Sequence, residues 1–228
     1  MLKCSLDKLQ DLFARIAQGA KLYMPLDNAD GTASFGEWKA GMEWSNALNT
    51  TKSPKDFFFP QTEDLMRFKT EGKSIEVIDV REAVEDFVVF GVRACDAKSF
   101  EILDRVFLTE PRDSFYAMKR EKGIIVSVAC QRPVETCFCT AFGINAAEPA
   151  GDVSAWKTED ALYLQANTEK GSALLASLGD ILEEGSDAAV AEQKKTIAKI
   201  MDKLPLKDLS ASDFGDGKTN EFFFNYFV

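Results

Sequence analysis

The alternation of hydrophobic and polar residues along the chain predicts several helices and a few short, buried strands. Apolar residues spaced three or four apart share one helical face, which predicts helices at residues 6–16 and 97–107. Compact apolar runs predict buried strands at 86–92 and 123–129. The other expected elements are helical segments at 63–68, 171–182 and 187–204, strands at 21–26 and 161–166, an irregular or weakly hairpin-like segment at 27–53 and a loop at 131–151.

The middle of the chain predicts the fold class. A strand, a helix and a strand follow one another within residues 86–129, which is typical of a right-handed βαβ unit with parallel strands. We therefore expect an α/β fold with a mixed or parallel sheet, this βαβ unit at its centre, helices on its faces and a helical C-terminal extension. The expected division is an α/β domain at 1–182, followed by a helix and tail at 183–228. The aromatic end, residues 222–227, would dock on the body or mark the place of a following domain or partner.

Composition narrows the possible functions. The chain has 228 residues, is 46% hydrophobic and carries a formal net charge of -10, without a basic stripe, which argues against nucleic-acid binding. It contains no histidine, so histidine-based catalysis and histidine-containing metal sites are excluded. Neither a signal peptide nor an apolar run long enough for a membrane helix is visible, so we expect a cytoplasmic protein without membrane insertion.

Four of the five cysteines are expected to meet at one edge of the sheet. Cys95 follows the first strand of the βαβ unit, and Cys130 follows the second. Parallel neighbouring strands place both residues at their carboxyl ends, where open α/β sheets bind ligands. Cys137 and Cys139 lie in the loop that leaves Cys130. Cys4 is isolated near the start of the chain and is given no role.

The surroundings of these cysteines favour thiolates. Cys95 is expected just before the helix at 97–107, whose N-terminal dipole would lower its pKa. Asp96 is expected either as the N-cap of that helix or as a group close to a bound cluster. Arg93 would either tune the potential of a cluster or pair with an acidic neighbour. Arg132 adds a further positive charge nearby.

Four cysteine thiolates form the usual ligand set of iron–sulfur clusters and of structural zinc. The spacing here matches no common ferredoxin or zinc-finger pattern, so inert buried thiols stay an equal alternative at this point. A disulfide between Cys137 and Cys139 would be strained, because one residue separates them. Glycine-rich nucleotide-binding motifs are absent from the sequence, although flavin sites do not require them.

Three stretches of the chain resemble one known family. They are Ser53–Glu63 (SPKDFFFPQTE), Gly91–Leu108 (GVRACDAKSFEILDRVFL) and Ile125–Gly143 (IVSVACQRPVETCFCTAFG). At these residues the chain resembles the N-terminal region of sulfhydrogenase beta subunits and of the A subunit of anaerobic sulfite reductase, and the resemblance covers roughly residues 1–180. Such subunits usually continue into a ferredoxin-like domain with two Cys-x-x-Cys-x-x-Cys runs. Residues 183–228 contain no such run.

The resemblance implies an electron-transfer subunit or domain of a cytoplasmic, anaerobic redox complex, rather than a catalyst by itself. The expected cofactor is an iron–sulfur cluster of the [4Fe–4S] type, held by Cys95, Cys130, Cys137 and Cys139. The expected partners are flavin- or cluster-bearing redox subunits. The alternatives are a docking or assembly module with empty or zinc-filled structural cysteines, and a flavin-using oxidoreductase subunit.

Overall fold

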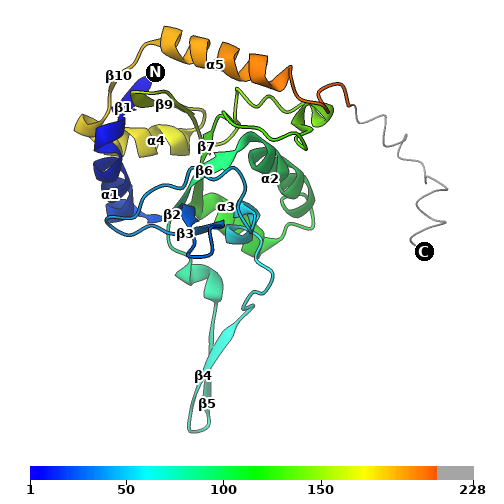
Figure 1. The fold of residues 1–228 in the computed structure, drawn as a ribbon. Helices are drawn as coiled ribbons and strands as arrows, with labels where there is room; N and C mark the ends of the chain where they lie inside the picture. Colours follow the sequence, from blue (N-terminus) through cyan, green and yellow to red (C-terminus); the bar gives the residue numbers. More distant parts are fainter. Residues whose placement is uncertain (210–228) are drawn as a thin grey trace, which may run out of the picture.

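The computed structural model describes residues 1–209 and shows an eight-stranded mixed sheet with helices on both faces, and a slender two-stranded arm (Figure 1). The strand order in the sheet is β10-β1-β9-β8-β7-β6-β2-β3. The strands of the sheet are β1 (Leu2–Ser5), β2 (Lys21–Asp27), β3 (Ala33–Glu37), β6 (Phe87–Arg93), β7 (Gly123–Val128), β8 (Val153–Lys157), β9 (Ala161–Ala166) and β10 (Glu183–Glu184). The helices are α1 (Leu9–Gly19), α2 (Ala94–Phe107), α3 (Ser114–Lys122), α4 (Glu169–Leu178) and α5 (Asp187–Met201), with short 3₁₀ turns at Leu6–Lys8, Pro54–Phe57, Val80–Ala83, Cys139–Phe142 and Gly179–Ile181.

The predicted α/β class and the central βαβ unit are confirmed. β2, β6, β7 and β8 are parallel neighbours, while β1, β3, β9 and β10 pair antiparallel with the strands beside them. β6 continues directly into α2, and α3 then leads into β7. Because the four parallel strands run side by side, their carboxyl ends form one edge of the sheet, and the candidate site lies there.

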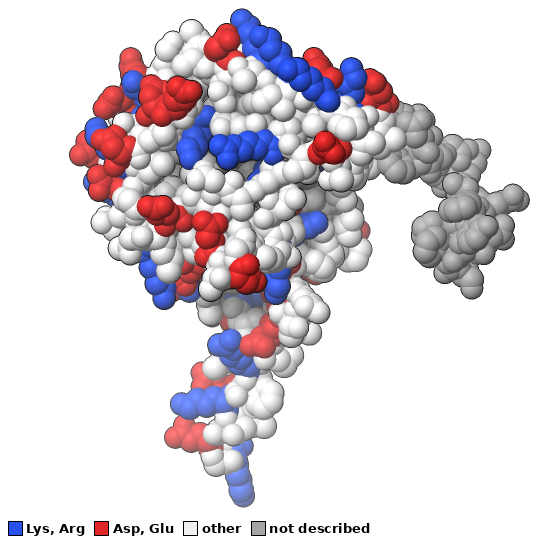
Figure 2. All heavy atoms as spheres, in the orientation of Figure 1, with Lys and Arg blue, Asp and Glu red and all other residues white. Residues whose placement is uncertain are grey.

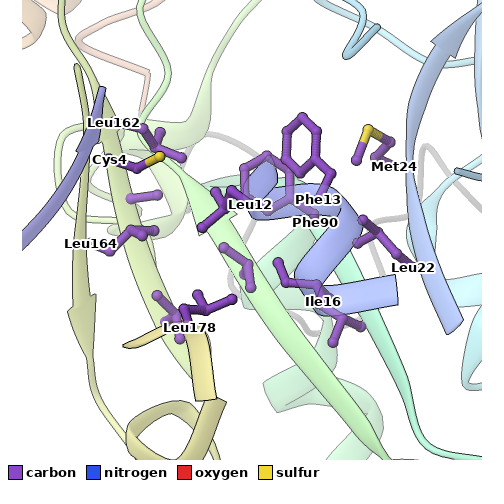
Figure 3. Packing of buried hydrophobic residues seen from close by; sticks show 14 of the residues in the cluster. Cys4, Leu12, Phe13, Ile16, Leu22, Met24, Phe90, Leu162, Leu164 and Leu178 are labelled. Carbon is purple, nitrogen blue, oxygen red and sulfur yellow. The ribbon is translucent and has the colours of Figure 1, made fainter. Parts of the chain in front are cut away.

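One face of the sheet is covered by α1 and α4. Leu12, Phe13 and Ile16 of α1 share one helical face and are at most 5% exposed, which explains why this segment forms an amphipathic helix. They pack on apolar side chains from alternate positions of the strands, including Val88 and Phe90 of β6. Cys4 of β1 is fully buried in this same cluster and lies beside Leu162 and Leu164 (Figure 3).

The other face is covered by α2, α3 and α5. Phe58, which follows the turn at Pro54–Phe57, is fully buried, and its ring centroid lies 5.1 Å from Phe87 and 4.9 Å from Phe100. Asp113 caps α3 by accepting hydrogen bonds from the backbone N–H groups of Phe115 and Tyr116. α5, which confirms the predicted C-terminal helix, packs its Val190 and Ile197 against the β8–β9 end of this face. The division of the chain after residue 182 stays a prediction.

A β-bulge interrupts β6 at Gly91. Phe90 pairs with Val126 of β7 and Val92 pairs with Ser127, so Gly91 is an extra residue in the ladder. Gly91 has a φ of +83°, which glycine adopts without steric cost. A Cβ at this position would lie 2.9 Å from Pro25 Cδ and 3.2 Å from Trp44 Nε1. The glycine therefore permits both the bulge and the close approach of Trp44.

The arm is a β-hairpin that projects from the body, formed by β4 (Arg67–Glu71) and β5 (Ser74–Ile78). Every residue of both strands is exposed, and the space-filling view shows acidic and basic groups interspersed along the arm (Figure 2). The predicted helical segment at 63–68 is wrong. Residues 63–66 are irregular and β4 starts at Arg67, because the alternating residues that follow have the period of a strand and not of a helix.

Other elements extend or shift what the sequence predicts. The predicted strands at 21–26 and 161–166 are confirmed as β2 and β9, and the predicted helix at 171–182 is α4, which ends at Leu178. β1, α3 and β8 had no counterpart among the expected elements. The aromatic end at 222–227 lies outside the described residues. Within residues 1–209, none of the helices combines the length and the apolar character that crossing a bilayer requires.

Candidate functional site

The four predicted cysteines come from the carboxyl ends of β6 and β7 and from the loop beyond β7. Cys95 lies in the first turn of α2, and Cys130 lies two residues after the end of β7. Cys137 lies in the loop, and Cys139 opens the 3₁₀ turn Cys139–Phe142. All five cysteines of the chain are free thiols, so the strained Cys137–Cys139 disulfide is not formed.

Backbone hydrogen bonds give the cysteine loop a defined path. The N–H of Cys130 donates to Ala146 O at 2.9 Å, which ties the start of the loop to its end. The N–H of Cys137 donates to Val134 O at 2.9 Å, and the Cys137 Sγ accepts from the N–H of Val134 at 3.3 Å. The 3₁₀ turn ends at Gly143, which has a φ of +64°. These contacts hold Cys137 and Cys139 in consecutive turns.

Some of the thiols lie near enough to affect the ionisation of one another. The neighbouring Cys130 raises the pKa of both Cys95 and Cys139, and Cys137 raises the pKa of Cys139. Cys130 therefore links the thiol at the start of α2 to the two thiols in the loop. Among residues 1–209, however, no three potential ligands of the cysteine, aspartate or glutamate type lie close enough together to hold a metal ion. The complete four-thiol ligand set stays a prediction.

The expected lowering of the Cys95 pKa is wrong for the free thiol. Although Cys95 is exposed at the surface, the protein atoms packed around its sulfur remove enough water to raise its pKa from the ordinary 9.0 to about 11. The Asp96 carboxylate next to it raises the pKa further, and this outweighs the hydrogen-bonding and Arg93 contributions that lower it. Burial and the neighbouring Cys137 likewise raise the pKa of Cys139.

The two charged residues predicted beside the cysteines have specific partners. Asp96 is not the N-cap, because α2 begins at Ala94 with Arg93 in the cap position. Instead, Asp96 lies in the first turn and its Oδ1 accepts a hydrogen bond from Ser53 Oγ at 3.0 Å. Arg93 is half-buried, with its Nη2 donating to Ala47 O at 2.7 Å and its Nη1 lying 4.0 Å from Cys130 Sγ. It therefore contacts a predicted ligand directly.

A cavity of about 350 Å³ opens beside Cys130 at the carboxyl edge of the sheet. Its apolar wall includes Leu6, Trp44 and Leu48, and Arg93 and Lys157 contribute charge. The residue-by-residue reading of the sequence missed Trp44 and Lys157. The strand that ends at Lys157 was not recognised, and Trp44 lies in a polar segment without periodicity. The glycine inside the apolar run 86–92 was an available signal, because an isolated glycine in a strand indicates a bulge or a close backbone approach.

The residues at this edge have the right donor atoms for an iron–sulfur cluster, but they are not arranged around a common point. Thiols are the right donors, and Cys130 is within electrostatic reach of two others. The described conformation does not gather three of them. A cluster at this position would therefore require the thiols to lie closer together than they do in the described conformation.

The chain is similar to one curated protein, sulfhydrogenase 2 subunit beta of Pyrococcus furiosus. The two sequences are 27% identical over 206 residues, which cover 87% of this chain and 60% of the relative. The chain thus spans less than two thirds of the length of that relative. No protein-family model matches the sequence, and no solved structure matches it. The similarity supports a relation to hydrogenase beta subunits, in agreement with the resemblance carried by the cysteine segments.

Proposed function

We propose that this chain is an iron–sulfur electron-transfer subunit, or part of one, in a redox complex similar to a hydrogenase. It would bind one [4Fe–4S] cluster through Cys95, Cys130, Cys137 and Cys139 and relay electrons between partner subunits that carry flavins or clusters. The observation that carries the proposal is the placement of Cys95 and Cys130 at the carboxyl ends of the neighbouring parallel strands β6 and β7, the sheet edge where α/β folds bind ligands, with Cys137 and Cys139 in the loop that follows. The similarity to a hydrogenase beta subunit supports the redox assignment.

Each residue of the site has a defined task in this proposal. The four thiolates would hold the iron, and the cluster would supply one-electron chemistry when bound. Arg93, which contacts Cys130 and is anchored on Ala47 O, would place a fixed positive charge beside a ligand sulfur. The high pKa of Cys95 means that iron must displace the thiol proton, so loading would release protons and become more favourable as the pH rises.

The test is anaerobic purification followed by iron and sulfide analysis and EPR of the reduced protein. We expect about four irons per chain and a reducible cluster signal. Cys137→Ser and Cys139→Ser should each abolish loading, whereas Cys4→Ala should load fully, because Cys4 is buried in the core away from the site. Full loading of both loop variants, or no iron in the wild-type protein after reconstitution, would refute the proposal.

A second candidate is a docking or assembly module whose cysteines are structural. It is favoured by the exposed apolar side of the β4–β5 arm, since exposed apolar patches commonly mark protein contacts. A colourless protein that contains one zinc, or no metal, and still assembles with redox subunits would support this candidate over the first.

A further inference from the structure

We infer that the cavity beside Cys130 is a binding site for a compact organic anion, a molecule that carries a phosphate or carboxylate group on a small carbon body. The inference goes beyond the proposed cluster and does not depend on it, because cations and an indole N–H carry it and thiols do not. The cavity lies where β1, β6, β7 and β8 end, which is the usual ligand edge of an open α/β sheet. Its volume of about 350 Å³ suits a small ligand.

The positive charge of the cavity is the first argument. Arg93, Arg132 and Lys157 all line it, in a chain with a net charge of -10. Within the part of the chain that the structure describes, none of the three forms an ion pair with a carboxylate. Glu159 is the one acidic residue among the described lining residues, and it is exposed. The cavity therefore has two positive charges in excess, and these can be neutralised by a dianion.

The hydrogen-bond donors of the cavity are the second argument. Arg93 uses Nη2 on Ala47 O, and Lys157 Nζ donates to Asn46 Oδ1 at 3.2 Å. The chain has two tryptophans besides Trp44, and neither lines the cavity. In both, Trp38 and Trp156, the indole Nε1 donates to a backbone carbonyl oxygen, at 2.9 and 2.7 Å. Trp44 lines the cavity, and its Nε1 has no acceptor among residues 1–209. An unused indole donor next to guanidinium and ammonium groups suits a ligand that is rich in acceptors.

The walls explain why the ligand should have a carbon body. The Trp44 ring stands edge-on to Phe90, with centroids 5.1 Å apart, and Lys157 Nζ lies 4.9 Å from its centroid. Leu6 and Leu48 extend the apolar surface. An inorganic anion would leave this surface uncovered, whereas an organic anion would cover it while its charged end meets the cations. The bulge at Gly91 leaves room for the close approach of Trp44, and bulges are common next to functional sites.

The test is titration of the purified full chain, followed by calorimetry and tryptophan fluorescence. The probes are AMP and succinate, one organic phosphate and one carboxylate, with adenosine and inorganic phosphate as the body and the charge alone. We expect saturable binding of AMP or succinate, weakened by added salt, and weaker binding of adenosine and phosphate. Binding of AMP alone would identify an organic phosphate as the ligand class, and binding of succinate alone a carboxylate.

Substitutions make the test specific to the cavity. Lys157→Gln and Arg132→Gln should each weaken binding of the better probe roughly tenfold, because each removes a charged hydrogen-bond partner. Lys195→Gln, on the exposed side of α5, is the matched control and should bind like the wild type. The inference is overturned if neither organic anion binds at millimolar concentration, if adenosine binds as well as AMP, or if the cavity variants match the control. Arg132 lies on an exposed loop, so its variant tests the inference even if Lys157→Gln misfolds.

Discussion

The central sheet and the arm are both built from strands that carry apolar residues, but only the sheet covers these residues. In β6, Val88 and Phe90 face α1 while Phe87 and Val89 face α2 and α3, and all four are at most 7% exposed. In the arm, Phe68 of β4 pairs with Val77 of β5, and these side chains are 68% and 66% exposed. Strands therefore form both from the continuous apolar run of β6 and from the alternating residues of the arm, whereas stability depends on what lies against each face.

The largest effect is expected where aromatic rings fill the sheet face. Phe58→Ala should lower the free energy of unfolding by about 3–5 kcal/mol, because it removes a fully buried ring packed on Phe87 and Phe100. Urea denaturation followed by circular dichroism measures the change. Phe59, 46% exposed, supplies the control, and Phe59→Ala should cost clearly less. Equal losses for the two variants would contradict the comparison.

Two glycines with positive φ test the same contrast through the backbone. Gly91→Ala should destabilise the protein by about 1–3 kcal/mol, since its Cβ would clash with Pro25 at a strained φ. Gly72 in the turn of the arm has a φ of +61° and no heavy atom within 4 Å of its would-be Cβ. Gly72→Ala should therefore alter the arm locally and leave the urea midpoint of the body nearly unchanged. A comparable midpoint shift would show that the arm and the body unfold together.

A smaller, pH-dependent effect is expected at Cys4 in the sheet core. Burial raises the pKa of the Cys4 thiol from 9.0 to about 11. The folded state thus holds this proton more tightly than the unfolded state, so its contribution to stability is complete below pH 9 and is lost as the pH rises toward 11. Stability measured from pH 8 to 11 should fall less in Cys4→Ala than in the wild type. Identical pH profiles would show that Cys4 is not the group responsible.

The smallest effect is expected on the apolar side of the arm. Phe68→Ser and Val77→Thr should each change the free energy of unfolding by less than about 0.5 kcal/mol, because neither side chain is covered in this chain. The measurement is urea denaturation, with Phe58→Ala as the reference for a covered ring. A loss above about 1 kcal/mol, which is roughly twice the usual effect of a surface substitution, would mean that the arm is packed in solution.

Sequence periodicity predicted most of the central fold. The apolar runs at 86–92 and 123–129 place apolar residues on both faces of a strand, which is stable only in a sheet covered on both sides. β6 and β7 were therefore correctly predicted. The arm was not predicted, because its alternation follows a run of apolar residues, Leu65 and Met66, that can also be counted as a helical face. β8 was not predicted, because it follows directly on an irregular loop that contains cysteine and proline.

The candidate site was predicted in its location and only in part in its geometry. The order of strands and cysteines along the chain was enough to place Cys95 and Cys130 at one sheet edge. The Arg93–Cys130 contact and the position of Trp44 depend on a bulge and on a long segment that crosses from β3, and neither is encoded in local periodicity.

The bulge at Gly91 also decides which sequence changes this strand can tolerate. Side chains alternate between faces, so one extra residue reverses the alternation for everything after it. As a result, Val92 stays on the side of α2, and Arg93 pairs with Val128 on the opposite side, toward the cavity. If Gly91 were instead an ordinary residue of the ladder, Val92 and Arg93 would exchange faces, and the guanidinium would lie on the apolar side covered by α2. Substitutions that force residue 91 into the ladder, and insertions of a single residue elsewhere in the strand, are therefore expected to be eliminated during evolution, even where other substitutions in the strand persist.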